Sequence, residues 1–176
     1  MSNTFTRYYQ AAVGTTPATL LTAAASTQTT VIGCTIANTT ASPITADAYI
    51  NANTSFTAGI SSTTMTVTFI ASGIITVGMT ITGGGISPGT KITGFGSGTG
   101  GTGTYTIDVA QSIAPGTSFA ANQNIYIVKA ATVPVGSSLA IIGADGKIVL
   151  NTGDNFDVVA SDPASADVLV SALLIT

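Results

Sequence analysis

The sequence predicts an all-β protein: an immunoglobulin-like or jelly-roll β-sandwich with a small Gly/Thr-rich β subdomain inserted in a loop. Three observations support this fold class. Apolar and polar residues alternate with a period of two in many short segments, as they do in half-buried strands. No stretch of about twelve residues has the apolar spacing of an amphipathic helix. Glycine and threonine are concentrated in the middle of the chain, so its composition differs from that of both ends.

The size and composition are those of a folded protein. The chain has 176 residues, of which 45% are hydrophobic, enough to bury the core of one domain or of two small ones. Only 6% are charged, whereas disordered chains combine low hydrophobicity with high charge. We therefore expect a surface that is polar mainly through Thr, Ser and Asn side chains.

The strand alternation is clearest at 44–51, where Ile44, Ala46, Ala48 and Ile50 alternate with more polar residues. Seven or eight short strands in about 110 residues match a small sandwich domain. The same periodicity predicts the other strands of the two outer parts of the chain, at 18–23, 29–37, 124–132, 138–142, 147–150, 155–160 and 166–175.

Two polar turns separate the last of these strands. Asp145-Gly146 lies between the strands expected at 138–142 and 147–150, and an Asp-Gly pair favours the type I′ turn of a β-hairpin. The sequence therefore predicts a hairpin here, and the segment 151–154 marks the next turn.

The middle segment, 56–121, has the richest Gly and Thr content but keeps strand patterning. Apolar residues alternate with polar ones at 65–69 and at 105–109, so the segment can bury a small core of its own. Insertions of this kind are accepted best at exposed loop tips. We interpret 56–121 as a small β subdomain inserted into an outer domain made of 1–55 and 122–176.

A weak internal repeat lies within this middle segment. Residues 86–92 and residues 113–119 share the pattern Ile-x-Pro-Gly-Thr followed two residues later by a large apolar residue. Pro-Gly favours a type II turn, because proline presets the first central residue and glycine accepts the positive φ of the second. The sequence predicts such a turn in each copy.

Side chains that carry out chemistry are scarce. The chain has no His and no Glu, four Lys and Arg together and one Cys. Acid-base catalysis and metal binding depend on these residue types with tuned pKa values or in clusters. We therefore predict no catalytic residue, no cofactor-binding residue, no metal ligand and no enzymatic activity. Cys34 alternates with Ile32 and Ile36, so it is predicted to be a buried core thiol.

Several apparent motifs have plainer explanations. Gly96–Gly101 and the overlapping Gly98–Gly103 match G-x-G-x-x-G, but no helix follows them, so we expect a tightly turned or flexible glycine loop and no nucleotide site. Four aspartates could suggest calcium, yet their spacing is not that of an EF-hand loop. We expect these four to be turn residues: Asp145, Asp154, Asp157 and Asp162.

The charge balance also excludes several partners. A net charge of −3 with so few cations argues against nucleic acid, whose binding needs many basic contacts. No apolar run approaches the roughly 20 residues of a membrane-spanning helix, so no membrane partner is expected. The sequons at Asn38 and Asn53 are expected by chance in a chain this rich in Asn, Thr and Ser.

The last predicted strand has apolar residues on both faces. Val168–Ile175 carries no charge, although soluble proteins usually protect exposed strand edges with charges or prolines. Two explanations remain open at this point. The strand is central in its sheet, or it is an edge that a neighbouring subunit covers.

Four stretches in the outer parts of the chain carry a resemblance to known proteins: 13–22, 30–38, 125–129 with 133–139, and 147–154. These stretches resemble small virion structural proteins of tailed bacteriophages, particularly marine and cyanobacterial ones. The middle segment, through 77–83, 86–94 and 100–105, is similar to Gly/Thr-rich modules of phage capsid, tail and fibre proteins. These similarities lie in turns and strands and span most of the chain.

The resemblance implies a structural component of a virion. We expect a capsid decoration or cement protein on the capsid surface that contacts other phage structural proteins, such as the major capsid protein, and associates with itself. The alternative is a tail, neck or fibre protein that contributes to host-surface attachment. A free carbohydrate-binding protein is a third possibility, which the absence of Trp weakens.

Overall fold

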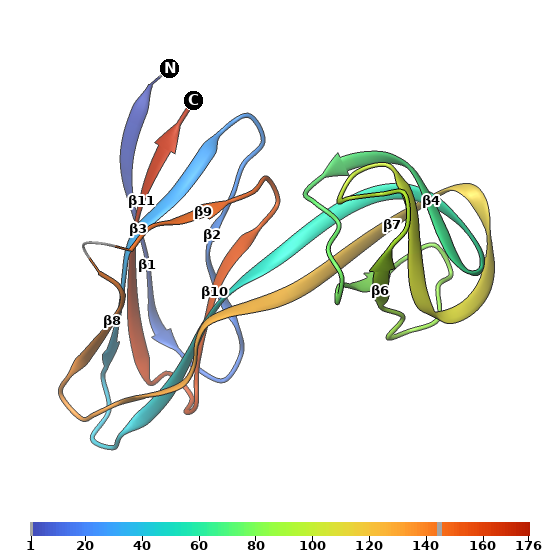
Figure 1. The fold of residues 1–176 in the computed structure, drawn as a ribbon. Helices are drawn as coiled ribbons and strands as arrows, with labels where there is room; N and C mark the ends of the chain where they lie inside the picture. The colour runs from blue at the N-terminus through green and yellow to red at the C-terminus, as the bar shows by residue number, and fades with distance from the viewer. Residues whose placement is uncertain (1, 144–145) are drawn as a thin grey trace. The chain divides into compact units, whose positions relative to one another are not determined.

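The structure is a computed structural model that describes residues 2–143 and 146–176. These residues form eleven β-strands in two antiparallel sheets and no helix, which confirms the predicted all-β sandwich class (Figure 1). The chain divides into two compact units: unit 1 is Met1–Asn51 with Asn124–Thr176, and unit 2 is Ala52–Gln123. These boundaries lie two to four residues from the compositional ones at 55/56 and 121/122, because two long strands, β4 and β7, continue through both.

The first sheet belongs wholly to unit 1. Its strands lie in the order β1 (Asn3–Val13), β11 (Ala166–Ile175), β3 (Gln28–Asn38) and β8 (Ser138–Ile142), and β9 (Ile148–Leu150) also pairs with β3. The terminal strand β11 is hydrogen-bonded to β1 on one side and to β3 on the other along almost its whole length. The central-strand explanation of its apolar character is therefore confirmed, and the edge explanation is wrong.

The predicted hairpin between β8 and β9 is wrong. β8 pairs with residues 34–37 of β3 and β9 pairs with residues 29–31, so the two strands follow each other along the same edge of β3. That edge offers backbone donors and acceptors to both strands and lets both contribute to the core. Asp145 lies outside the described residues, and the N–H of Gly146 donates to the carbonyl of Gly143 at 3.1 Å.

The second sheet is shared by the two units. Its order is β2 (Ala18–Thr22), β10 (Asn155–Ala160), β4 (Ile44–Ser72), β7 (Gly103–Val133) and β5 (Thr80–Thr82), and β6 (Ile92–Phe95) also pairs with β7. Unit 1 contains β2, β10, residues 44–51 of β4 and residues 124–133 of β7. Unit 2 contains β5, β6 and the remainder of β4 and β7.

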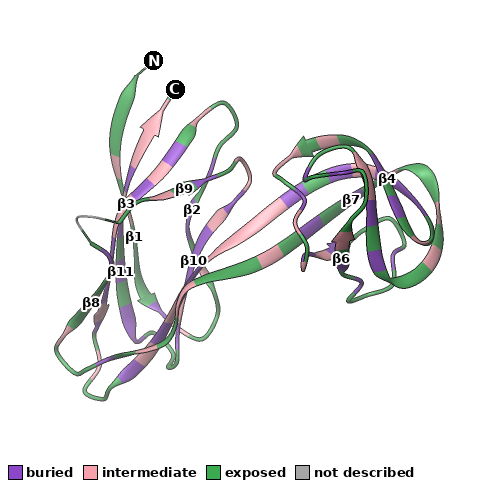
Figure 2. Cartoon of the chain, in the orientation of Figure 1, coloured by how far each residue is buried: buried purple, intermediate pink, exposed green. Residues whose placement is uncertain are grey.

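The core of unit 1 is built from the inward rows of both sheets. Figure 2 shows the alternation of buried and exposed positions along the strands, and Ile36, Phe156 and Val170 are fully buried. Cys34 lies in this core as predicted. Ile32 does not share its face, because β3 carries one extra residue between Val31 and Gly33, and this bulge brings Val31 into the core in its place.

Unit 2 has a separate core, which shares no residue with that of unit 1. β4 reverses its direction at Ser62, whose φ is 57°, and its two arms then lie side by side, with the Thr68 hydroxyl 3.3 Å from the carbonyl of Thr57. Phe56 stacks on Phe119 across this core at 5.7 Å between ring centroids. A core of this kind satisfies the requirement for an independent β subdomain.

Both Pro-Gly turns of the internal repeat form. Gly89 has φ of 83° and Gly116 has φ of 85°, the values that a type II turn needs at its second central residue. In each turn the Thr hydroxyl donates to the carbonyl three residues earlier, at 2.7 Å for Thr90 and 2.8 Å for Thr117. The repeat is therefore a repeated turn that connects chain segments of one small core.

Candidate interaction surface

Potential metal ligands do not cluster in the described part of the chain. Within 2–143 and 146–176, no three His, Cys, Asp or Glu side chains come together as metal ligands could. Every buried side-chain nitrogen or oxygen in the same part of the chain has a hydrogen-bond partner. No helix in these residues is long and apolar enough to cross a membrane.

Cys34 is 1% exposed, and burial raises the pKa of its thiol to about 12. A thiolate is the reactive form of cysteine, so this side chain is inert at neutral pH.

The predicted turn aspartates behave differently from one another. Asp154 closes the turn after β9, where its carboxylate accepts the N–H of Asn151 at 2.9 Å. Asp162 lies in the loop between β10 and β11, and its carbonyl accepts the hydroxyl of Ser165. Asp157 was wrongly predicted as a turn residue, since it lies within β10 and pairs with Tyr49 of β4. Asp145 lies outside the described residues.

The glycine motif is a tight loop around one aromatic ring. It lies between strands β6 and β7, and Tyr105 at its end is 1% exposed. The Tyr105 hydroxyl donates to the carbonyl of Gly101 and accepts the N–H of Gly100 at 3.0 Å. A Cβ on Gly98 would lie 2.5 Å from the ring, so only glycine fits there. Packing against Tyr105 therefore explains Gly98, whereas Gly96 and Gly103 allow close approach to Thr104 and to the backbone of Gly98.

The sequon at Asn38 is buried. Its side chain is 7% exposed and donates to the carbonyl of Val133 at 3.0 Å and to that of Ser42 at 2.8 Å. Glycosylation needs an exposed amide, so Asn38 serves as a structural link between loops.

One surface for analysis is the face of the first sheet that points away from the core, here called the outer face. Its side chains form rows across the strands, because β1, β11 and β3 are paired in register. One row joins Tyr9 to Leu169 and Thr35, and another joins Phe5 to Leu173 and Thr30, with Val149 of β9 beside Thr30. Between them lies the row of Arg7, Ser171 and Gly33.

Several large apolar side chains on this face are exposed. Phe5 is 74% exposed, Tyr9 71%, Val149 60% and Leu169 43%. Single exposed apolar side chains are ordinary, but several on one sheet face are typical of an interaction surface. A hollow of about 460 Å³ crosses the strands beside the Tyr9 row, lined among others by Ala37, Ser138 and Asp167.

The strands of this sheet carry only two charged side chains, Arg7 and Asp167. The Arg7 guanidinium lies 5.6 Å from the centroid of the Tyr9 ring, a cation–π distance. One oxygen of Asp167 accepts the N–H of Ala12 at 3.0 Å, in the bulge where β1 shifts register. Exposed aromatic and aliphatic side chains with few charges beside them suit this face to contact with another protein.

A second, more polar cluster lies on the second sheet within unit 1. Asp157 is 6% exposed and accepts the Thr19 hydroxyl at 2.7 Å. Burial raises the pKa of Asp157, and the hydrogen bond from Thr19 partly opposes this. Tyr49 contacts Tyr126 at 5.2 Å between centroids, and the Lys129 ammonium lies 4.4 Å from the Tyr126 ring. Each of these polar side chains has its partner within the cluster, so we assign the cluster a structural role.

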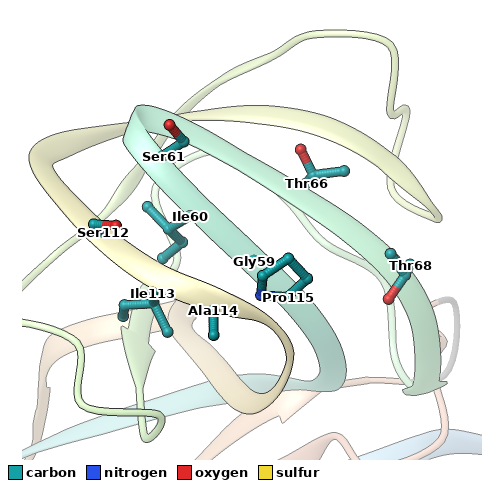
Figure 3. A pocket seen from close by; sticks show the side chains of 9 residues that line it. All are labelled: Gly59, Ile60, Ser61, Thr66, Thr68, Ser112, Ile113, Ala114 and Pro115. Carbon is teal, nitrogen blue, oxygen red and sulfur yellow. The ribbon is translucent and has the colours of Figure 1, made fainter.

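Unit 2 has a groove of about 560 Å³ formed by the reversal of β4 and by the second Pro-Gly turn (Figure 3). Ile60, Ile113 and Pro115 supply apolar surface there. A Cβ on Gly59 would lie 2.8 Å from the Cα of Pro115, so glycine permits the close approach of β4 to the turn. The remaining lining is small or carries a hydroxyl: Ser61, Thr66, Thr68, Ser112 and Ala114.

Comparison with known proteins assigns no relative to this chain. No family model, no curated protein and no solved structure matches it. The function must therefore be argued from the surfaces themselves, and in particular from the outer face.

Proposed function

We propose that the protein is a non-enzymatic structural component of a bacteriophage virion, a capsid decoration or cement protein that contacts its neighbours through the outer face. The observation that carries this proposal is the set of exposed apolar side chains on strands with only two charges. The resemblance of the outer segments to phage virion proteins supports the assignment to a bacteriophage particle. The scarcity of His, Glu and Cys supports a role that depends on shape and assembly.

The outer face offers enough apolar area to drive association. Phe5 and Tyr9 are 74% and 71% exposed, and together they expose on the order of 300 Å². Covering that area contributes about 7 kcal/mol before the costs of association are subtracted. A contact of this kind resists salt, because the strands of this sheet carry only Arg7 and Asp167 as charged side chains.

One observation favours the alternative, a tail, neck or fibre protein that contributes to host attachment. The groove of unit 2 combines apolar side chains with the hydroxyls of Ser61, Thr66 and Ser112 and carries no charge. Such a lining suits a neutral ligand on a cell surface. In that arrangement the outer face would hold the protein to the tail, and unit 2 would contact the host.

The test is quantitative mass spectrometry of purified virions, before and after a wash in about 1 M NaCl, where the Debye length is near 3 Å. A capsid decoration protein is expected at on the order of hundreds of copies per particle and to remain after the wash. A count of about six or twelve, as cyclic tail assemblies have, would support the alternative. Absence of the chain from virions would refute both assignments, and release by salt would refute attachment through an apolar face.

A further inference from the structure

We propose that the partner seated on the outer face is a second copy of this chain, related to the first by a two-fold axis, so that two outer faces pack against each other. The inference rests on the proposed function in treating this face as a contact surface, and it goes further by naming the occupant. The positions of the two charges and of the apolar rows favour a self-complementary contact.

The two charges lie on opposite sides of the Tyr9–Leu169 row. Arg7 belongs to β1, and its cross-strand partner Ser171 follows Leu169 by two residues on β11. Asp167 precedes Leu169 by two residues on the same strand. Each charge is therefore about 7 Å from the row along the strand direction, at 3.3 to 3.4 Å per residue.

A two-fold rotation about this row, with the axis in the plane of the sheet, exchanges the two sides. It places Arg7 of one copy opposite the β1 position that neighbours Asp167 in the other copy, so the two charged residues are offset sideways by one strand spacing, about 4.8 Å. With the sheets about 10 Å apart, their Cα atoms are about 11 Å apart, and the Arg and Asp side chains together span this distance. Because the contact is isologous, the ion pair forms twice, and neither charge of the face is buried unpaired.

The same rotation places the apolar row on its own copy. The row of Tyr9 and Leu169 lies at the centre of the contact, as aromatic anchors do in protein interfaces. The hollow of about 460 Å³ is lined by Tyr9, Leu169 and Asp167 among others, so it also lies at the centre of the contact and leaves room for the two tyrosine rings.

The face is large enough for a stable dimer. β1 is 11 residues long, so the face extends about 33 Å along its edge strand, and four strands at about 4.8 Å give a width near 19 Å. The product is on the order of 600 Å² per copy, which is the lower end of the area that stable dimers bury. Two sheets packed in this way would be about 10 Å apart, like the layers of a sandwich.

Sedimentation equilibrium of the full chain tests the proposal without any virus. At about 50 μM we expect a mass near 35 kDa, twice the 17.3 kDa of one chain. Tyr9→Lys puts two like charges at the axis and is expected to weaken dimerisation at least about 30-fold. The matched control is Phe69→Lys, which changes an aromatic residue of unit 2 that is 59% exposed and is expected to leave the dimer unchanged.

A double-mutant cycle tests the ion pair. Arg7→Gln and Asp167→Asn are each expected to weaken the dimer by about three- to tenfold, and the double variant no further than either single one. Asp167→Asn keeps the oxygen that accepts the N–H of Ala12, so the bulge of β1 is retained. Circular dichroism and the unfolding midpoint verify that each variant is folded.

Three results would overturn the dimer: a mass of 17.3 kDa for the unaltered chain at about 50 μM, a dimer that Tyr9→Lys does not weaken, or additive effects in the cycle. These results are separate from the virion assay. A monomer in solution refutes the two-fold contact only, whereas absence from virions refutes the proposed function and leaves the dimer standing.

Discussion

Replacing Tyr105 with Phe tests whether unit 2 folds on its own core. The ring of Tyr105 is buried and remains so in Tyr105→Phe, but the hydroxyl is lost. That hydroxyl holds the glycine loop by accepting the N–H of Gly100 and donating to the carbonyl of Gly101. Gly100 is itself buried, so water cannot easily replace the lost partner.

The expected loss of stability is about 2 to 3 kcal/mol. An unsatisfied buried N–H costs about 1 to 3 kcal/mol, and the loss of the second hydrogen bond adds about 1 kcal/mol, part of which relaxation of the loop recovers. A unit of this size exposes surface on unfolding that corresponds to an m-value of about 1 kcal/mol per M in urea. The midpoint of the unit 2 transition should therefore fall by about 2 to 3 M urea.

Urea unfolding followed by two probes measures this effect. Hydrogen exchange with mass spectrometry reports each unit separately, and circular dichroism reports the whole chain. We expect peptides of unit 2 to lose protection earlier in Tyr105→Phe, whereas peptides of unit 1 keep their midpoint. The control is Tyr126→Phe in unit 1, where the ring is 41% exposed and the loss should be below about 0.5 kcal/mol.

An equal shift of both units in Tyr105→Phe would refute the reasoning, because it would mean that the two cores unfold as one cooperative unit. A loss below about 0.5 kcal/mol in unit 2 would refute the role of the hydroxyl in holding the loop.

Three further predictions concern unit 1. Ala12 and Ala130 have φ of 56° and 51°, a left-handed conformation that is strained for alanine but not for glycine. Ala12→Gly and Ala130→Gly should therefore each raise the free energy of unfolding in urea by about 0.5 to 1 kcal/mol, and destabilisation would contradict this. The folded pKa of Asp157 is raised above 3.8, so its carboxyl contributes most to the free energy of unfolding below that pH, and this contribution is lost as the pH rises through the folded pKa. Asp157→Asn should therefore flatten this part of the plot of stability against pH between acid and neutral pH, and an unchanged plot would contradict the prediction. Cys34 should resist iodoacetamide at pH 8 until the protein is unfolded in urea, since its thiol has a pKa of about 12, and rapid labelling of the native protein would contradict its burial.

Local patterning determined much of the fold. The alternation at 44–51 and 155–160 predicted strands that form there, because the period of two is a property of the chain itself and needs no partner. The Pro-Gly turns at 88–89 and 115–116 formed for the same reason, since the φ preferences of proline and glycine are local. The absence of His and Glu likewise follows directly from the sequence and limits the chemistry available.

Tertiary structure decided which strands meet and which faces remain uncovered. β1 was missed because it is an edge strand whose residues are mostly exposed on both faces, so little burial pattern marks it. The pairing of β8 and β9 with β3, in place of a hairpin, depends on hydrogen bonds to residues more than 100 positions away. The outer face itself exists only because register aligns Phe5 and Tyr9 of β1 with Leu173 and Leu169 of β11, and register is set by contacts between distant parts of the chain.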